Sequence, residues 1–159
     1  MSADRLHSAP AAVLFACNFN QVRSPMAEAL LKRLVGRGIY VDSCGLKRPP
    51  VLLDDYNEPL TASADPFVHA VMAEIGCDLV RHRPKTFEDL EDNSFDLVIS
   101  LTPEAQHRAV ELARSRAADI EYWPTLDPTM TEGSRETRMT AYRQVRDALL
   151  RRIADRFGG

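Results

Sequence analysis

Short apolar segments alternate with longer segments of helical periodicity along this chain of 159 residues. Continuous apolar runs are typical of strands that are buried on both faces of a parallel sheet. The expected strands are 12–17, 39–43, 95–101 and 119–123, and the expected helices are about 24–35, 65–74, 103–116 and 134–157. Strands that alternate with helices require right-handed crossovers. We therefore predict a single α/β domain with a four-stranded parallel sheet, in the order 2-1-3-4, and helices on both faces.

The residues at the segment ends support these assignments. Pro25 suits the first turn of a helix, and Asp65-Pro66 and Thr102-Pro103 are each typical of a helix cap followed by a first turn. The polar residues 1–10 are expected to be a flexible N-terminus, and residues 11–159 to form the domain. Residues 45–64 are expected to be a long irregular loop, to which the sequence assigns no role.

Charge and cysteine content exclude several classes of protein. Lysine and arginine number 20 against 23 acidic residues, a net charge of −3, so we expect no nucleic-acid partner. No run of about 18 apolar residues predicts a membrane span, and the N-terminus lacks the features of an export signal. The cysteines Cys17, Cys44 and Cys77 have no paired spacing, which indicates free thiols in the cytoplasm and no zinc site.

The loop after the first strand carries the residues for phosphate chemistry. Cys17 ends that strand, and five residues separate it from Arg23, where the next helix begins. A thiolate is a nucleophile, and a helix N-terminus with a nearby guanidinium favours the thiolate form. Backbone N–H groups at such a terminus bind phosphate, and arginine can hold two phosphate oxygens at once. Ser24 adds a hydroxyl that can donate a hydrogen bond to the sulfur.

The same spacing occurs a second time without the same context. Five residues also separate Cys77 from Arg83, but no strand precedes Cys77 and no helix start follows it. We therefore expect Cys77 to pack at a helix end. The order strand, loop and helix around Cys17 makes the first occurrence more specific than the spacing alone.

Several segments together resemble one known family. Segment 13–28, Val-Leu-Phe-Ala-Cys-Asn-Phe-Asn-Gln-Val-Arg-Ser-Pro-Met-Ala-Glu, resembles the signature of low-molecular-weight protein tyrosine phosphatases and the related arsenate reductases. Segment 41–45 is similar to the family's second strand, and segment 76–83 to the stretch that places a histidine near the loop. Segment 95–99 matches the third strand, and Asp127-Pro128 occupies the position of the general acid.

The resemblance implies a cysteinyl-phosphate mechanism. Cys17 would attack phosphorus, Arg23 and the loop amides would stabilise the equatorial oxygens, and Asp127 would act as general acid and then as base. Ser43 and His82 would support the loop, with Asn20 holding its shape. The substrate-binding residues would be Asn18, Phe19, Asn20, Gln21, Val22 and Ser24. No cofactor and no metal are expected.

The loop departs from the family pattern at several positions. Phe19 replaces the usual glycine and would either narrow the phosphate mouth or form a hydrophobic wall. Val22 replaces a second loop cysteine that could protect Cys17 as a disulfide. Gln21 occurs in a run that also resembles phosphatases acting on phosphoserine of the RNA polymerase tail. Residues 129–130 are Thr-Met where the family often has tyrosines, so an aromatic wall must come from Phe19 or Tyr56.

Three functions follow from these observations. The leading hypothesis is a protein tyrosine phosphatase that acts on a phosphorylated protein or a small phosphomonoester, as a monomer or weak homodimer. An arsenate reductase would need two further thiols placed to relay a disulfide. A non-catalytic phosphate-binding module is the third hypothesis.

The last helix also carries an arginine-rich face, which we interpret as solvated, with a docking surface as the alternative. Its members are Arg135, Arg138, Arg143, Arg146, Arg151, Arg152 and Arg156.

Overall fold

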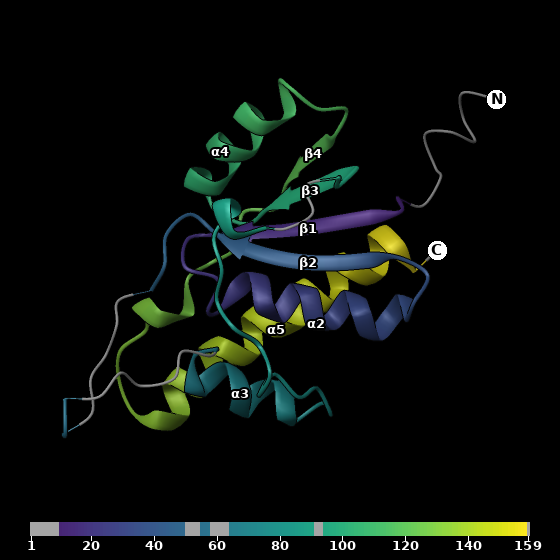
Figure 1. The fold of residues 1–159 in the computed structure, drawn as a ribbon. Coiled ribbons are helices and arrows are strands. Elements are labelled where there is room, and N and C mark those ends of the chain that lie inside the picture. The colour runs from purple at the N-terminus through teal and green to yellow at the C-terminus, as the bar shows by residue number, and fades with distance from the viewer. Residues whose placement is uncertain (1–9, 50–54, 58–63, 91–93, 159) are drawn as a thin grey trace.

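A parallel four-stranded sheet organises the chain, as the sequence predicts (Figure 1). The computed structural model describes residues 10–49, 55–57, 64–90 and 94–158. The strands lie side by side in the order β2-β1-β3-β4, and all three pairings are parallel. The four strands are β1 (Ala12–Cys17), β2 (Tyr40–Gly45), β3 (Leu97–Ser100) and β4 (Asp119–Tyr122). The fold class and strand order are therefore confirmed, whereas the predicted flexible segment 1–10 lies outside the described residues except for Pro10.

Helices cover both faces of the sheet. In Figure 1, α2 and α5 lie below the sheet, α4 lies above it, and α3 packs on the outer side of α5. The helices are α2 (Arg23–Val35), α3 (Pro66–Ala73), α4 (Pro103–Ala113) and α5 (Arg135–Phe157), with short 3₁₀ turns η1 (Phe87–Asp89) and η2 (Pro128–Met130). No helix among the described residues has a stretch that is both long and apolar enough to cross a membrane.

Side chains of β1 alternate between two apolar cores, one on each face of the sheet. Val13, Phe15 and Cys17 face α2 and α5, where the largest cluster also contains the buried stripe of α5. Leu14 and Ala16 belong to the second cluster, beneath α4. This alternation follows from the two-residue period of a strand. It also decides to which side of the sheet Cys17 points.

The predicted helix starts form through the expected caps. The Thr102 hydroxyl accepts a hydrogen bond from the Ala105 N–H at the start of α4, and the Asp65 carboxylate accepts one from the Phe67 N–H at the start of α3. The sequence placed the end of β2 two residues too early. The strand continues to Gly45 because Cys44 and Gly45 pair in register with Ala16 and Cys17 of β1, a contact between distant segments that local pattern does not show.

Candidate active site

The loop that joins β1 to α2 lies at the carboxyl end of the sheet. Cys17 is the last residue of β1 and is 3% exposed, and its sulfur lies 2.9 Å from the Ser24 hydroxyl oxygen. Val22 is the N-cap residue of α2, and its side chain makes no hydrogen bond to the helix. Within the described part of the chain, the backbone N–H groups of Phe19, Gln21 and Val22 have no acceptor. The loop therefore presents unpaired donors, as an anion-binding loop requires.

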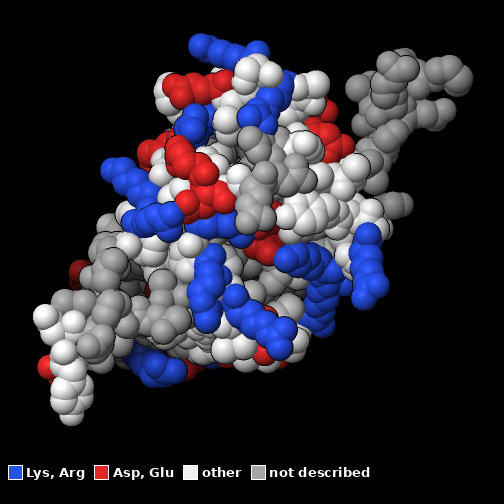
Figure 2. All heavy atoms as spheres, in the orientation of Figure 1, with Lys and Arg blue, Asp and Glu red and all other residues white. Residues whose placement is uncertain are grey.

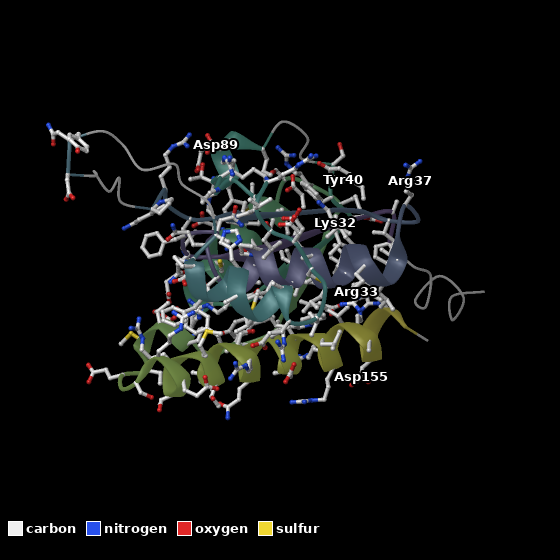
Figure 3. All side chains as sticks on the ribbon, turned by 90° about the horizontal axis from the view of Figure 1, so that it is seen from below. Lys32, Arg33, Arg37, Tyr40, Asp89 and Asp155 are labelled. Carbon is white, nitrogen blue, oxygen red and sulfur yellow. The ribbon has the colours of Figure 1, made fainter. Side chains whose placement is uncertain are left out.

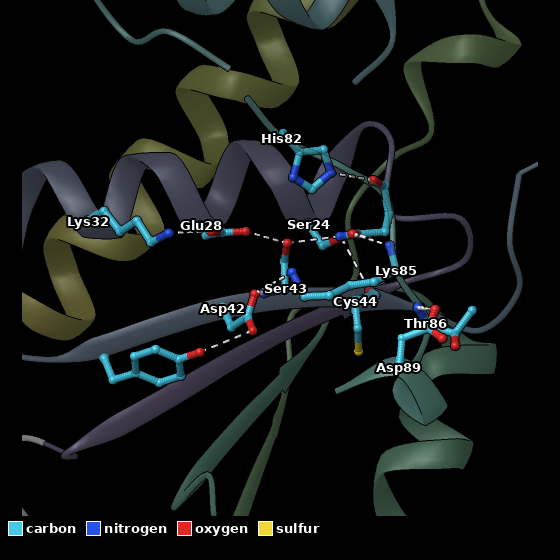
Figure 4. A network of polar contacts seen from close by, with 12 residues as sticks. Ser24, Glu28, Lys32, Asp42, Ser43, Cys44, His82, Lys85, Thr86 and Asp89 are labelled. Atoms are coloured by element: carbon cyan, nitrogen blue, oxygen red, sulfur yellow. Dashed lines mark hydrogen bonds and ion pairs between the residues drawn. The ribbon is translucent and has the colours of Figure 1, made fainter. Parts of the chain in front are cut away.

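Asn20 holds the loop through four hydrogen bonds. Figure 4 labels their partners, which are Ser24, Ser43, His82 and Lys85. Its φ of 58° is left-handed, a conformation that asparagine tolerates better than most residues. Its side-chain N–H₂ group donates to the hydroxyls of Ser24 (2.8 Å) and Ser43 (2.9 Å), and its side-chain oxygen accepts from the Lys85 N–H (3.0 Å). Its backbone carbonyl accepts from His82 Nε2 at 2.7 Å. The structure therefore brings the predicted residues Ser43 and His82 to the loop.

The Ser24 hydroxyl has two partners besides Asn20. Its oxygen accepts from Asn20 and lies 2.9 Å from the Cys17 sulfur, and its hydrogen can also be donated to the Cys44 carbonyl at 3.4 Å. Ser43 likewise accepts from Asn20 and donates to the Glu28 carboxylate. Burial lowers the pKa of His82, which favours the neutral ring that donates from Nε2.

A cavity of about 140 Å³ opens above the loop. Its walls are Cys17, Asn18, Phe19, Gln21, Val22, Arg23, Asp65, Asp127 and Thr129. Arg23 Nη1 donates to the Thr125 carbonyl at 2.9 Å, and Arg23 Nη2 lies 4.0 Å from Asp127 Oδ2. Asp127 Oδ1 accepts from the N–H and the hydroxyl of Thr129, so this carboxylate both forms the turn at η2 and faces Arg23. The structure thus brings Cys17, Arg23 and Asp127 to one cavity.

Two predicted binding residues shape the cavity in different ways. Phe19 is 43% exposed and forms part of the cavity wall. Asn18 is fixed through its side-chain amide. The amide oxygen accepts a hydrogen bond from the Thr102 hydroxyl at 2.8 Å, and the amide nitrogen donates one to the Glu104 carboxylate at 3.0 Å. Tyr56 is 86% exposed and does not line the cavity. Of the two expected sources of an aromatic wall, the structure places only Phe19 there.

Asp65 is a cavity residue that the sequence identified only as a helix cap. Its backbone N–H donates to the Gln21 carbonyl at 3.0 Å. Its carboxylate accepts from the Phe67 N–H at 2.7 Å and from the Tyr142 hydroxyl at 3.1 Å. Burial and the Asp65 carboxylate raise the pKa of Tyr142, which keeps this hydroxyl protonated and donating. The Asp65-Pro66 pair was the available signal, but it does not reveal the contact with the loop.

Glu28 and Lys85 are further contacts that sequence reasoning missed (Figure 4). Glu28 lies one helical turn after Ser24, accepts from Ser43 and pairs with Lys32. Glu28 follows Ser24 by four residues, so the helical period places both side chains on one face of α2, and this spacing could have indicated Glu28 from the sequence. Lys85 contributes its backbone N–H to Asn20 and its ammonium group to Asp42, 2.7 Å away.

The three thiols lie in separate environments. Cys44 pairs in register with Ala16 and packs beneath α4, whereas Cys17 packs on the opposite face of the sheet. Side chains that leave opposite faces of a sheet point apart, which disfavours a disulfide. Burial raises the pKa of the Cys44 thiol, and the neighbouring Cys17 raises it further. Cys77 lies 3.7 Å from Arg33 and lines a different cavity, of about 530 Å³.

The fold and the loop define an α/β protein with a loop of unpaired backbone N–H groups at the carboxyl end of its first strand. Among the residues described, no group of three His, Cys, Asp or Glu side chains is placed to hold a metal ion. The family described as low molecular weight phosphotyrosine protein phosphatase matches residues 12–155. The chain therefore belongs to this family.

Curated relatives of the chain include arsenate reductases. The arsenate reductase of Halalkalibacterium halodurans is 28% identical over 143 residues, which cover 89% of this chain and 91% of the relative. The glutaredoxin arsenate reductase of Synechocystis sp. is 33% identical over 89 residues, which cover 56% of this chain and 58% of that relative. The second match therefore spans little more than half of either protein.

Solved structures share the fold over nearly the whole chain. The Erwinia amylovora tyrosine phosphatase amsI has a TM-score of 0.69 at 20% identity, covering 95% of this chain and 93% of that one. An arsenate reductase in the phosphate-binding state has a TM-score of 0.64 at 26% identity, covering 91% of this chain and 94% of that one. The same fold thus occurs in proteins named for two different activities.

Proposed function

We propose that this protein hydrolyses phosphomonoesters, with phosphotyrosine in proteins as its substrate class. One observation carries the proposal: Cys17, Arg23 and Asp127 line a single cavity above a loop with unpaired N–H groups. Phe19 gives this cavity an apolar wall against which an aromatic leaving group can pack. The three free cysteines favour action in a reducing compartment such as the cytoplasm.

The reaction proceeds in two steps. The Cys17 thiolate attacks phosphorus, the bond to the leaving oxygen breaks, and Asp127 gives that oxygen a proton. Water then attacks the phosphocysteine, Asp127 takes a proton from it, and the sulfur leaves as a thiolate. Phosphate and the free enzyme are the products, and no oxidant or reductant is consumed.

The loop supplies the stabilisation that both steps require. Negative charge on the equatorial oxygens is met by the unpaired loop N–H groups and by Arg23. The guanidinium of Arg23 has five N–H donors, and the Thr125 carbonyl uses one of them, so the others are available to phosphate. The Ser24 hydroxyl, 2.9 Å from the sulfur, stabilises Cys17 as the attacking and leaving thiolate.

Hydrolysis of an aryl phosphate at mildly acidic pH tests the proposal. Cys17→Ser is expected to abolish turnover, and Asp127→Asn to reduce kcat about 10²–10⁴-fold. Cys77→Ser is the matched control, since Cys77 lines a different cavity, and it should keep wild-type activity. Wild-type activity in Cys17→Ser would refute the mechanism. Phosphate binding by a folded wild-type protein without turnover would instead support a non-catalytic module.

Arsenate reduction is a second candidate because two curated relatives carry that name. Reduction by thiols requires a further sulfur that attacks the Cys17–arsenic adduct. Cys44 lies on the opposite face of the sheet and Cys77 lines another cavity, so the attacking thiol must come from an external reductant. Arsenate-dependent consumption of reduced thioredoxin or glutathione would support this activity, and no consumption would exclude it.

A further inference from the structure

Two arginines at the start of α5 stack on the same aromatic ring, that of Phe67. Arg135 and Arg138 are exposed, and their guanidinium carbons lie 5.5 and 4.5 Å from the centroid of the Phe67 ring. Across the described ranges, neither has a carboxylate within ion-pair distance or a hydrogen-bond acceptor. Arg143, by contrast, pairs with Glu74 and Glu136.

The ring on which the two arginines stack belongs to the segment that lines the cavity above the β1–α2 loop. Phe67, on which they stack, follows Asp65 by two residues, and Asp65 lines that cavity. Phe67 also stacks on the Tyr142 ring at 5.1 Å, and the Tyr142 hydroxyl donates to Asp65. Asp127 and Arg138 both lie close enough to this hydroxyl to shift its pKa, upward and downward respectively.

Stacking prepares these side chains to bind an anion. An aromatic face holds a guanidinium by a cation–π contact and restricts its motion, so less side-chain entropy is lost on binding. The N–H edges of both guanidinium groups stay open, and each can bind a carboxylate or phosphate through two parallel hydrogen bonds. The cavity itself contains the carboxylates of Asp65 and Asp127, which would repel an acidic substrate without nearby positive charge.

We propose that Arg135 and Arg138 form a second anion site, which binds an acidic or phosphorylated side chain near the phosphotyrosine of a protein substrate. This inference rests on the proposed phosphatase function and narrows its substrate class. Carboxylates and phosphates share the recognised chemistry, and the experiment below separates them. Other exposed arginines serve as controls: Arg37 lies beyond the end of α2 that is remote from the loop (Figure 3), and Arg151 lies in the distal half of α5.

The test compares phosphotyrosine peptides that differ only in their flanking residues. One peptide has alanine flanks, one has aspartate flanks and one has a second phosphotyrosine. Wild type is expected to prefer the two acidic peptides, and Arg135→Gln/Arg138→Gln to reduce that preference about tenfold at low salt, through KM rather than kcat. Hydrolysis of a small aryl phosphate should not change. The preference should weaken as salt is raised.

Two further measurements keep the outcomes distinct. Arg37→Gln/Arg151→Gln removes the same net charge and should keep the full preference. Equilibrium binding of the same peptides to Cys17→Ser, with and without the two arginine substitutions, reports the site without turnover. If acidic peptides bound more tightly and this preference depended on the two arginines, but the wild type hydrolysed none of the peptides, the phosphatase proposal would be overturned and the second anion site retained. Hydrolysis without such a preference, or an equal loss in the control, would overturn the site alone. Neither hydrolysis nor acid-preferring binding would overturn both.

Discussion

Gly45 is a position where one methyl group should disable the site without unfolding the protein. It ends β2 in register with Cys17. A Cβ atom added there would lie 2.8 Å from the Asn20 nitrogen, 2.8 Å from the Phe19 carbonyl carbon and 2.9 Å from the Asn18 oxygen. All three are backbone atoms of the loop that joins β1 to α2, so no side chain can rotate to make room.

The expected size of the effect follows from these contacts. Ordinary contact begins near 3.4 Å, so the loop backbone must move by roughly half an ångström in Gly45→Ala. A misplacement of about 1 Å can cost on the order of 10² in rate, so we expect kcat/KM to fall about 10- to 100-fold. Overpacking should lower the free energy of unfolding by about 1–3 kcal/mol. Aryl phosphate hydrolysis and denaturant unfolding measure the two quantities.

Gly36→Ala provides a control of similar stability cost. Gly36 follows α2 with a φ of 59°, and a Cβ there would meet no atom within 4 Å. Backbone strain should therefore cost about 1–3 kcal/mol of stability while activity stays near wild type. If folded Gly45→Ala kept wild-type kcat/KM, or if both variants lost activity equally, the argument that Gly45 positions the loop would be wrong.

Three other perturbations test the contacts around the site. Tyr142→Phe should lower the free energy of unfolding by about 1 kcal/mol at neutral pH. Because folding raises the pKa of Tyr142, the stability of the wild type should also fall as the pH rises through about 10. Unfolding titrations should show no such decline for the variant. Ser24→Ala should slow both turnover and iodoacetamide labelling of Cys17, and unchanged labelling would contradict the assigned hydrogen bond. Hydrogen bonds from two arginines of α5 lower the pKa of Glu74 from 4.5 to about 2, so stability present above pH 4.5 should decline as the pH falls toward 2, and Glu74→Gln should flatten that decline in acid unfolding.

Local pattern was sufficient to predict the fold. The apolar runs of β1 and β3 are short and continuous, and Asp65 and Thr102 cap their helices through contacts two and three residues away. Such interactions lie within one segment, so sequence reveals them. The short turn η2 was not predicted, because it spans only three residues and a common Asp-Pro turn looks the same in sequence.

Residue spacing by itself predicted only those site residues that share the loop, and Asp127 was predicted from the family resemblance. Cys17, Arg23 and Ser24 were found because the strand, loop and helix bring them together within eight residues. Lys85 and Asp65 were not, because their contacts with the loop join segments more than forty residues apart. Almost every residue type has a backbone N–H group, so the identity of Lys85 does not indicate that its N–H donates to the loop. Family resemblance supplied Ser43 and His82, which physical reasoning from spacing alone does not reach.

The arginines of α5 show why a charge pattern does not determine the role of its members. In sequence they form one arginine-rich face, and solvation was the expected state for all of them. The structure divides them by partner: Arg146 is buried and donates to the Val71 carbonyl at 2.7 Å, and Arg143 pairs with carboxylates, so these two fasten α5 to α3. Arg135 and Arg138 stack instead on Phe67, which follows the cavity residue Asp65 by two positions. An arginine that is held in place but left without an acceptor retains its capacity to bind an anion, and its stacking on the segment that lines the cavity makes that capacity relevant to the proposed substrate choice.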